Sequence, residues 1–303
     1  ASELWIWLCF LPLSLGYSMA TYEVAFGAAV QYDESNSRRN ISIITFYGGV
    51  ASTLTWIGLG ALLPSVGLEY ATIICGGLLM SQGLIVHLTT APHRLPNDSK
   101  KELTPFKWHA IKYNERQAIL ILATVGTLHE LIFGATSLMF IAWFLEQGFG
   151  AELAVILAAI YGPFQVIGRI AEMKYGANID ARITGIIALI MVPIGLLLIL
   201  PDQIELAVLG MVVFGIGNGV ITVSNGYVVN MYFRAKVYGR AKGIISAPRS
   251  LGSAAGPAIG VFLYHSLGST HFVLMASIGL LAAVIFAILL RLPAIQGSQL
   301  KHA

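Results

Sequence analysis

Long apolar stretches alternate with short polar connections along the chain. Nine stretches of roughly 20 residues or more carry few charges or none, and a helix of that length crosses about 30 Å of hydrocarbon. They lie at about 4–30, 41–63, 70–90, 117–145, 153–172, 183–200, 204–232, 242–264 and 270–290. Membrane-spanning strands would be about 10 residues long with alternating polarity, which these stretches lack. The pattern predicts an all-α polytopic membrane protein with about nine transmembrane helices.

The chain has few charged residues for its length. Of its 303 residues, 56% are hydrophobic and 11% are charged, and the mean hydropathy is +0.77. Soluble domains carry about 25% charged residues to cover their surface. The composition therefore argues against a soluble domain and for a chain embedded in a lipid bilayer.

The basic residues are confined to one side of the predicted topology. The odd-numbered connections and the C-terminal tail contain every Lys and Arg except Arg169 and Arg249, which fall near helix ends on that same side. Because basic loops stay in the cytoplasm, we expect a cytoplasmic C-terminus and an N-terminus outside, in a bacterial cytoplasmic (inner) membrane. The net charge of +3 then reflects topology and does not indicate a nucleic-acid partner.

One long basic connection, residues 93–117, divides the chain. Residues 1–92 are predicted to form a partial N-terminal bundle of three helices, and residues 118–303 a C-terminal bundle of six. Within the linker, residues 105–113 mix aromatic and basic side chains. They suit either a short helix on the anionic membrane surface or a solvated loop.

Six helices after a long basic linker resemble the C-terminal half of a major facilitator superfamily transporter. The first stretch, with GYSMATYEVAFGAAVQY, is similar to the family's fourth helix. The GIGNG run at 215–219 and YGRAKG at 238–243 resemble the tenth helix and the loop after it. The resemblance implies a secondary active transporter of the twelve-helix fold, matching helices 4 to 12.

Two departures from the family pattern are visible. The family's first three helices have no counterpart in the sequence, so we expect missing N-terminal helices or a partner subunit to be required for transport. The family's charged loop motif is represented only by a degenerate version at 168–176. There, Arg169 and Glu172 are three residues apart and could pair across one helical turn as a conformational latch, or could be ordinary charges at a helix end.

Amides interrupt the apolar stretch at 204–232. Asn218 and Asn225 are two helical turns apart, and Thr222 lies between them on roughly the same face. An amide in hydrocarbon must find a polar partner, either a neighbouring helix or a water-filled cavity. These three residues are candidates for contact with solute, with interhelical hydrogen bonding as the alternative.

Ionisable residues within the apolar stretches provide further candidates, because such residues are costly in a membrane and usually face an aqueous path. Glu23, Glu130 and His129 are candidates for binding a proton or solute, although His129 and Glu130 point about 100° apart. Arg249 is a candidate anion anchor or partner of a carboxylate. Structural hydrogen bonding is the alternative for each.

Small residues recur at every fourth position of the eighth stretch. Gly252, Gly256 and Gly260, with Pro257, follow the spacing of the glycine-proline motif that drug antiporters of the superfamily carry in their fifth helix. Here the motif lies in the counterpart of the eleventh helix, so it does not establish antiport. We expect these residues to pack tightly against a neighbouring helix.

These features predict a transporter that moves a small-molecule solute by alternating access, with protons as a candidate coupling ion. A non-transporting membrane scaffold or receptor, or an inactive transporter fragment, is the alternative. An enzyme is not expected: HExxH would begin at His129, but residue 133 is Phe, and no catalytic residues, metal site or cofactor motif can be named. Cys9 and Cys75 lie in apolar stretches and are expected to be free thiols.

Overall fold

The computed structural model describes residues 8, 11–16, 20–89 and 111–294, and every regular element within them is a helix. This confirms the all-α fold class. The expected linker at 93–117 lies outside the described residues as far as residue 110, and Cys9 lies outside them too. Cys75 is a free cysteine.

The chain divides into two compact units, one of residues 1–47 and 109–303 and the other of residues 48–108. The first unit contains α2 (Tyr22–Tyr32) and the beginning of α3 (Ser37–Thr89). The rest of α3 forms the second unit and is interrupted at Gly67, whose φ of 76° and ψ of 171° are not helical. Glycine adopts a positive φ without strain. The two limbs of α3 on either side of Gly67 correspond to the predicted helices at 41–63 and 70–90.

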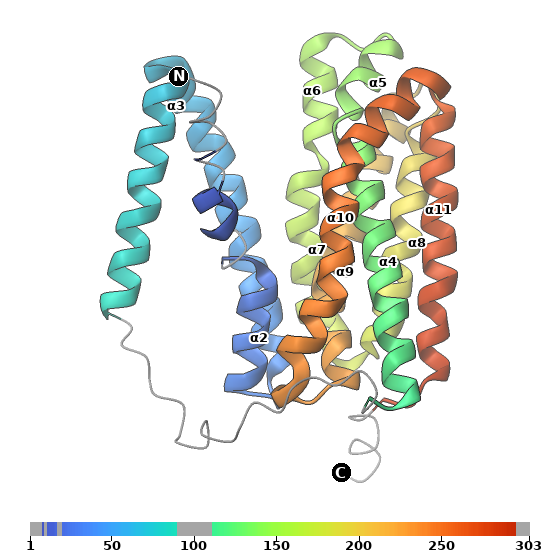
Figure 1. Ribbon diagram of the computed structural model, residues 1–303. Coiled ribbons are helices and arrows are strands. Elements are labelled where there is room, and N and C mark those ends of the chain that lie inside the picture. The colour runs from blue at the N-terminus through green and yellow to red at the C-terminus, as the bar shows by residue number, and fades with distance from the viewer. Residues whose placement is uncertain (1–7, 9–10, 17–19, 90–110, 295–303) are drawn as a thin grey trace. The chain divides into compact units, whose positions relative to one another are not determined.

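Within the first unit, the chain after residue 111 builds a helical bundle (Figure 1). Helix α10 packs on α4, α4 on α11, α11 on α8, α8 on α9, and α9 on α7. Short helices α5 and α6 complete the ends of α4 and α7. The elements are α4 (Tyr113–Ser137), α5 (Phe140–Glu146), α6 (Ala151–Ala159), α7 (Tyr161–Tyr175), η3 (Gly176–Asn178), α8 (Ala181–Leu198), α9 (Ile204–Tyr232), α10 (Ala235–Leu267), α11 (Thr270–Ala287) and η4 (Ile288–Arg291).

The outer face of this bundle is apolar, as a membrane requires. Helix α8 exposes five aliphatic side chains spaced three or four residues apart, so they form one stripe along the helix. They are Ile183, Ile187, Ile190, Ile194 and Leu197. A soluble protein rarely exposes an apolar surface of this extent, so the stripe is the lipid-facing side of an integral membrane protein.

Six helical segments of the described chain are long and apolar enough to span a membrane, fewer than the nine expected. Helix α10 has 33 residues but is not among them, because its glycines, prolines, serines and charges lower its hydropathy. The first predicted stretch, 4–30, falls partly outside the described residues. A hydropathy threshold therefore misses helices such as α10, in which polar residues lower the mean hydropathy.

Glycines bring α10 against α4. A Cβ atom on Gly256 would lie 3.0 Å from Cα of Gly134, and one on Gly252 or Gly260 would overlap the backbone of α4. Pro257 covers Gly134 from the α10 side. Because no side chain separates the two backbones at these positions, α4 and α10 are in close backbone contact.

Substituting alanine at two glycines of α10 separates helix contact from helix propensity. Gly260→Ala should lower stability by about 1–3 kcal/mol, since the new methyl group overlaps the backbone at Ala135. Gly243→Ala has open space around its Cβ and should leave the protein equally or more stable. Thermal unfolding in detergent measures both, and equal unfolding temperatures for the two variants would contradict the close packing.

Candidate functional site

A cavity of about 380 Å³ lies within the first unit, between α2, α4, α9 and α10. Its wall contains three charged side chains, Glu23, Glu130 and Arg249. Phe26 supplies an apolar wall, and six hydroxyl groups complete a polar lining in an otherwise apolar region. The hydroxyl groups belong to Thr21, Tyr22, Thr222, Ser246, Ser250 and Ser253.

Arg249 on α10 holds the two carboxylates of the cavity together. Its Nε donates to Oε1 of Glu130 at 3.0 Å, and Nη2 donates to the same oxygen. Its Nη1 lies 3.5 Å from Oε1 of Glu23 on α2, which also accepts a 3.4 Å hydrogen bond from Ser246. Glu130 is therefore the tightly bound partner and Glu23 the loosely bound one. All three side chains are between 20% and 28% exposed.

The sequence of α10 places these groups on one face. Lys242, Ser246, Arg249 and Ser253 follow one another at intervals of four, three and four residues, which is one side of a helix. On α4, Gly126 gives the stem of Arg249 room to cross, because a Cβ there would lie 3.2 Å from Arg249 Cδ. Gly126 is one turn before Glu130, so the guanidinium reaches that carboxylate over a bare stretch of helix.

Lys242 is a site residue that the sequence analysis missed. The sequence pattern groups Lys242 with the basic residues of the cytoplasmic connections, yet only 2% of it is exposed. Its Nζ donates to the carbonyl of Asn225 at 3.5 Å and lies 5.9 Å from the ring centroid of Phe26. The four-three-four spacing of polar residues on α10 is the signal that could have found it.

The other predicted residues take different positions around the cavity. Thr222 lines it, whereas Asn218 and Asn225 are buried. The amide of Asn218 donates to the carbonyl of Phe214 in its own helix at 2.8 Å, and Thr222 donates to the carbonyl of Asn218. His129 is buried beside Glu130 and is only 6% exposed. The structure thus brings Glu23, Glu130, Arg249 and Thr222 to one cavity.

Arg169 and Glu172 are both buried, but they do not take each other as partners. Arg169 Nη1 donates to the carbonyl of Thr45 at 2.8 Å. Glu172 Oε1 accepts from Arg38 Nη2 at 2.5 Å and from the Thr184 hydroxyl at 3.2 Å. The expected pair across one helical turn is replaced by two contacts to α3, because a partner on another helix reaches these buried groups from inside the protein.

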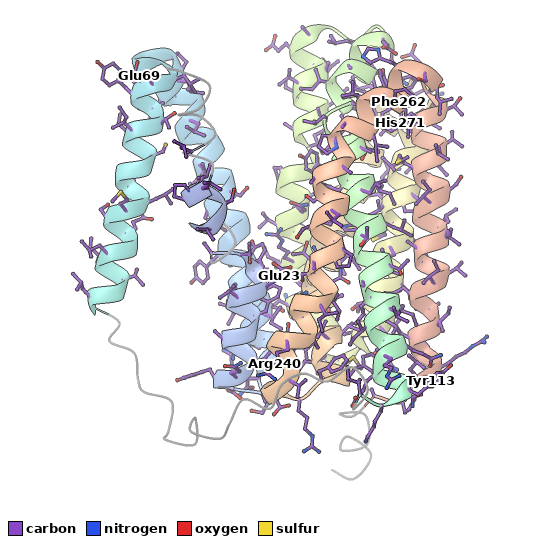
Figure 2. All side chains as sticks on the ribbon, in the orientation of Figure 1. Glu23, Glu69, Tyr113, Arg240, Phe262 and His271 are labelled. Carbon is purple, nitrogen blue, oxygen red and sulfur yellow. The ribbon has the colours of Figure 1, made fainter. Side chains whose placement is uncertain are left out.

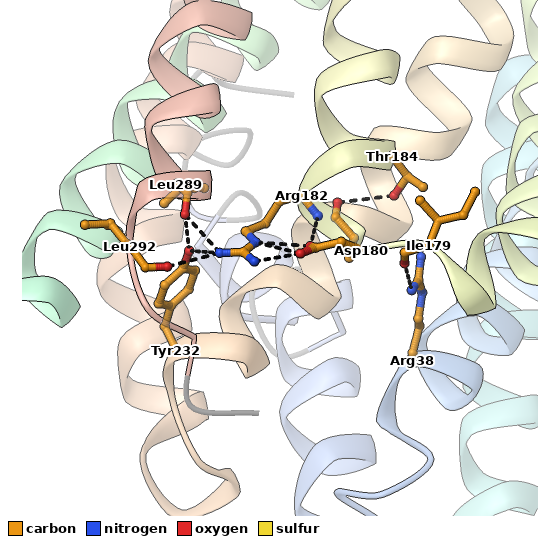
Figure 3. A network of polar contacts seen from close by, with 9 residues as sticks. Arg38, Ile179, Asp180, Arg182, Thr184, Tyr232, Leu289 and Leu292 are labelled. Atoms are coloured by element: carbon orange, nitrogen blue, oxygen red, sulfur yellow. Dashed lines mark hydrogen bonds and ion pairs between the residues drawn. The ribbon is translucent and has the colours of Figure 1, made fainter. Parts of the chain in front are cut away.

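Arg38 makes several contacts in a second cluster of polar groups, and Figure 3 shows the one to Ile179. Besides Glu172, its guanidinium donates to the carbonyl of Ile179 at 2.6 Å and lies 5.2 Å from the ring centroid of Tyr227. A larger cavity of about 810 Å³ adjoins these groups. The beginning of α3 is therefore fastened to α7 and to the loop before α8.

A separate set of contacts fastens the start of α8 to η4 and the residue after it (Figure 3). Arg182 Nη2 lies 2.6 Å from Oδ2 of Asp180, and Nη1 donates to the carbonyls of Leu289 and Leu292 at 3.1 Å each. Burial raises the pKa of Asp180, but the hydrogen bonds from Arg182 lower it further, so the pKa lies below its ordinary value. The carboxylate is accordingly ionised at neutral pH and caps α8.

No group of three or more His, Cys, Asp and Glu side chains that could hold a metal ion occurs among the described residues. The charged and polar groups of the cavity between α2, α4, α9 and α10 are two carboxylates, one guanidinium and several hydroxyl groups. Such groups bind a polar solute or exchange protons.

Comparison with known proteins finds a family match over part of the chain and a similar transporter structure. Residues 173–303 match the model of the Major Facilitator Superfamily. No curated protein sequence matches the chain. Among solved structures, the human organic anion transporter MFSD10 (TETRAN) is similar at a TM-score of 0.51 and 17% sequence identity, over 56% of this chain. The resemblance drawn from the sequence is thereby confirmed. This chain spans 40% of the length of that transporter chain.

Two neighbouring arginines of α3 test the second cluster. Arg38→Gln leaves the Glu172 carboxylate, which is 3% exposed, without its guanidinium, and should cost about 3–5 kcal/mol of stability. Arg39→Gln removes the same charge from an exposed position and should change stability by less than about 0.5 kcal/mol. Thermal unfolding in detergent compares them. An unfolding temperature for Arg38→Gln equal to that of Arg39→Gln would show that the contact to Glu172 is not formed.

Proposed function

We propose that this chain, whose residues 173–303 match the model of the Major Facilitator Superfamily, is a secondary active transporter that moves a small solute by alternating access. The observation that supports this proposal most is the cavity that contains Glu23, Glu130 and Arg249. Charged side chains are rare within membrane-spanning helices and usually mark the path of a solute or ion. In superfamily transporters such sites lie near the bilayer midplane between two helical bundles.

Alternating access requires one group of helices to move relative to another while the site remains between them. Arg249 makes contacts of unequal strength to Glu130 on α4 and to Glu23 on α2. Because α4 and α10 are in close backbone contact, we expect Arg249 to keep Glu130 through the cycle. The longer contact to Glu23 is the one that opens when α2 moves away from α10.

Protons are the proposed coupling ion, and Glu23 is the proposed proton carrier. A carboxylate takes up a proton more readily when less positive charge and fewer donors surround it. Glu130 accepts two nitrogens of Arg249, whereas the contacts of Glu23 measure 3.4 and 3.5 Å. Protonation of Glu23 would then release α2 from α10, since a neutral Glu23 loses its attraction to Arg249.

Transport itself is tested in liposomes. A metabolite panel is first screened for solutes that raise the unfolding temperature of the purified protein, and stabilising solutes are then assayed for uptake. The 303-residue chain and the full product of its natural coding sequence are reconstituted in parallel, which tests whether further helices or a partner subunit are required. A scaffold or receptor would bind a partner in pull-down experiments and give no flux from either preparation.

Glutamine substitutions test the coupling. Glu23→Gln should reduce uptake driven by a pH gradient at least tenfold while solute exchange at equal pH persists, because the carboxylate that carries the proton is gone. Glu130→Gln frees Arg249 from its tight partner and should impair both kinds of transport. If neither substitution alters pH-driven uptake, these carboxylates do not couple protons to solute.

The proposed topology places the two ends of the bundle on opposite sides of a bacterial inner membrane. At one end, the Ala235 amide donates to Glu34 at 3.2 Å and Arg38 reaches Ile179. At the other end, the Gln147 side chain donates to the carbonyl of Leu200 at 2.8 Å. The first end carries the basic residues and is therefore proposed to be cytoplasmic.

Cysteine labelling decides this orientation. In a background with Cys9 and Cys75 replaced by serine, a single cysteine is introduced at residue 150 or at residue 178. An impermeant maleimide applied to intact cells should modify the first and spare the second until the cells are broken. The reverse labelling pattern would falsify the orientation.

A further inference from the structure

We propose that the cavity binds a solute with one negative charge and takes up one proton on Glu23 together with it. This inference rests on the proposed transport function and specifies the class of solute and the stoichiometry of coupling. It depends on Lys242, which lies behind the wall of the cavity and completes a balanced set of charges.

Three charged side chains line the cavity, namely Glu23 (labelled in Figure 2), Glu130 and Arg249. A fourth, Lys242, is buried behind Phe26, with its Nζ 5.9 Å from the centroid of that ring. With both carboxylates ionised, their charges sum to zero. Lys242 is 2% exposed and contacts a backbone carbonyl and an aromatic ring rather than a carboxylate at close range. Its charge is therefore balanced only by the group as a whole.

The other titratable side chains near Glu23 and its neighbours in the described chain are two tyrosines and a histidine. Tyr22 is its neighbour on α2, Tyr238 belongs to α10, and His129 belongs to α4. The polar groups that α9 contributes nearby, Thr222 and the carbonyl of Asn225, carry no charge. The neutral sum thus refers to the four charged groups named above.

An unbalanced charge is costly in a membrane interior, so the sum restricts what can enter. A cationic solute would leave the group with one excess positive charge. An anionic solute alone would leave one excess negative charge. With the proposed proton on Glu23 the sum becomes plus one, so a neutral solute would leave it unbalanced. A monoanionic solute that enters together with this proton keeps the sum at zero.

The geometry supplies a place for both particles. The proton adds to the Glu23 carboxylate, which then no longer attracts Arg249. Nη1 of Arg249, 3.5 Å from Glu23 in this structure, becomes available to donate to the solute anion, while Nε and Nη2 stay on Glu130. On the opposite side of the membrane the proton and the anion leave together, and the group returns to its balanced state.

The volume of the cavity limits the size of a solute that fits inside it. A volume of about 380 Å³ corresponds to roughly 12 water molecules at about 30 Å³ each. Benzoate, benzamide and benzamidine are smaller than this limit, nearly identical in shape, and carry charges of minus one, zero and plus one. They are therefore suitable probes of the charge that the cavity accepts.

Binding of these three probes to purified protein is measured by calorimetry in buffers of different ionisation enthalpy, which reports the protons taken up. Wild type should bind benzoate with one proton taken up per molecule and more tightly at lower pH. Glu23→Gln fixes the protonated charge state. It should bind benzoate at least tenfold more tightly than benzamide or benzamidine, without proton uptake.

Two further variants keep the test independent of folding defects. Glu23→Gln combined with Lys242→Gln returns the sum to zero and should lose the preference for benzoate. Glu152→Gln removes a negative charge from an exposed position on α6 and should bind the probes as wild type does. The absence of a benzoate preference in Glu23→Gln would overturn the proposal, as would benzoate binding to wild type without proton uptake.

These outcomes are separate from those of the flux assay. Selective benzoate binding without flux of any solute would contradict transport and leave the anion and proton site standing. Flux of a solute with no benzoate preference in Glu23→Gln would support transport and contradict the anion and proton site.

Discussion

The arrangement of the cavity depends on one guanidinium shared between two carboxylates in an apolar region. An arginine side chain stays charged in proteins, so Arg249 needs a carboxylate partner in this apolar region. Glu130 provides that partner within the bundle, and Glu23 provides a second one on α2. The same contact therefore holds α2 against α10 and defines the polar wall of the cavity.

The positions of the helices make this sharing feasible. Glycines at the contact of α4 and α10 remove the side chains that would separate Arg249 from Glu130. At the far end of α2, the contacts of Arg38 and Arg169 fasten the start of α3 to α7. The segment from α2 to the start of α3 is thus held by charged groups at both ends. Between them lie further contacts, such as the hydrogen bond from the Ala235 amide to Glu34 and the apolar packing of Phe26 and Ile41 on Gly226.

The sequence predicted the helices well because their apolar length is a local property. The stretch at 204–232 coincides with α9, and that at 183–200 with α8 to within two residues. Charged side chains were harder to assign, since their partners lie on other helices. Their spacing of three residues on one helix suggested that Arg169 could pair with Glu172. In the structure, both side chains contact α3 instead. Lys242 was assigned by its position along the chain, whereas its burial depends on which face of α10 it occupies.

The bare surface of α4 at Gly126 links two positions that are 123 residues apart in the sequence. A Cβ atom at residue 126 would lie 3.2 Å from Cδ of Arg249, so even alanine there would make the stem of Arg249 shift by a few tenths of an ångström. A larger side chain would compete with that stem for space and weaken the contact between Arg249 and Glu130. In the evolutionary history of this protein, residues 126, 130 and 249 are therefore expected to have changed as one unit, whatever happened to the helix surfaces around them.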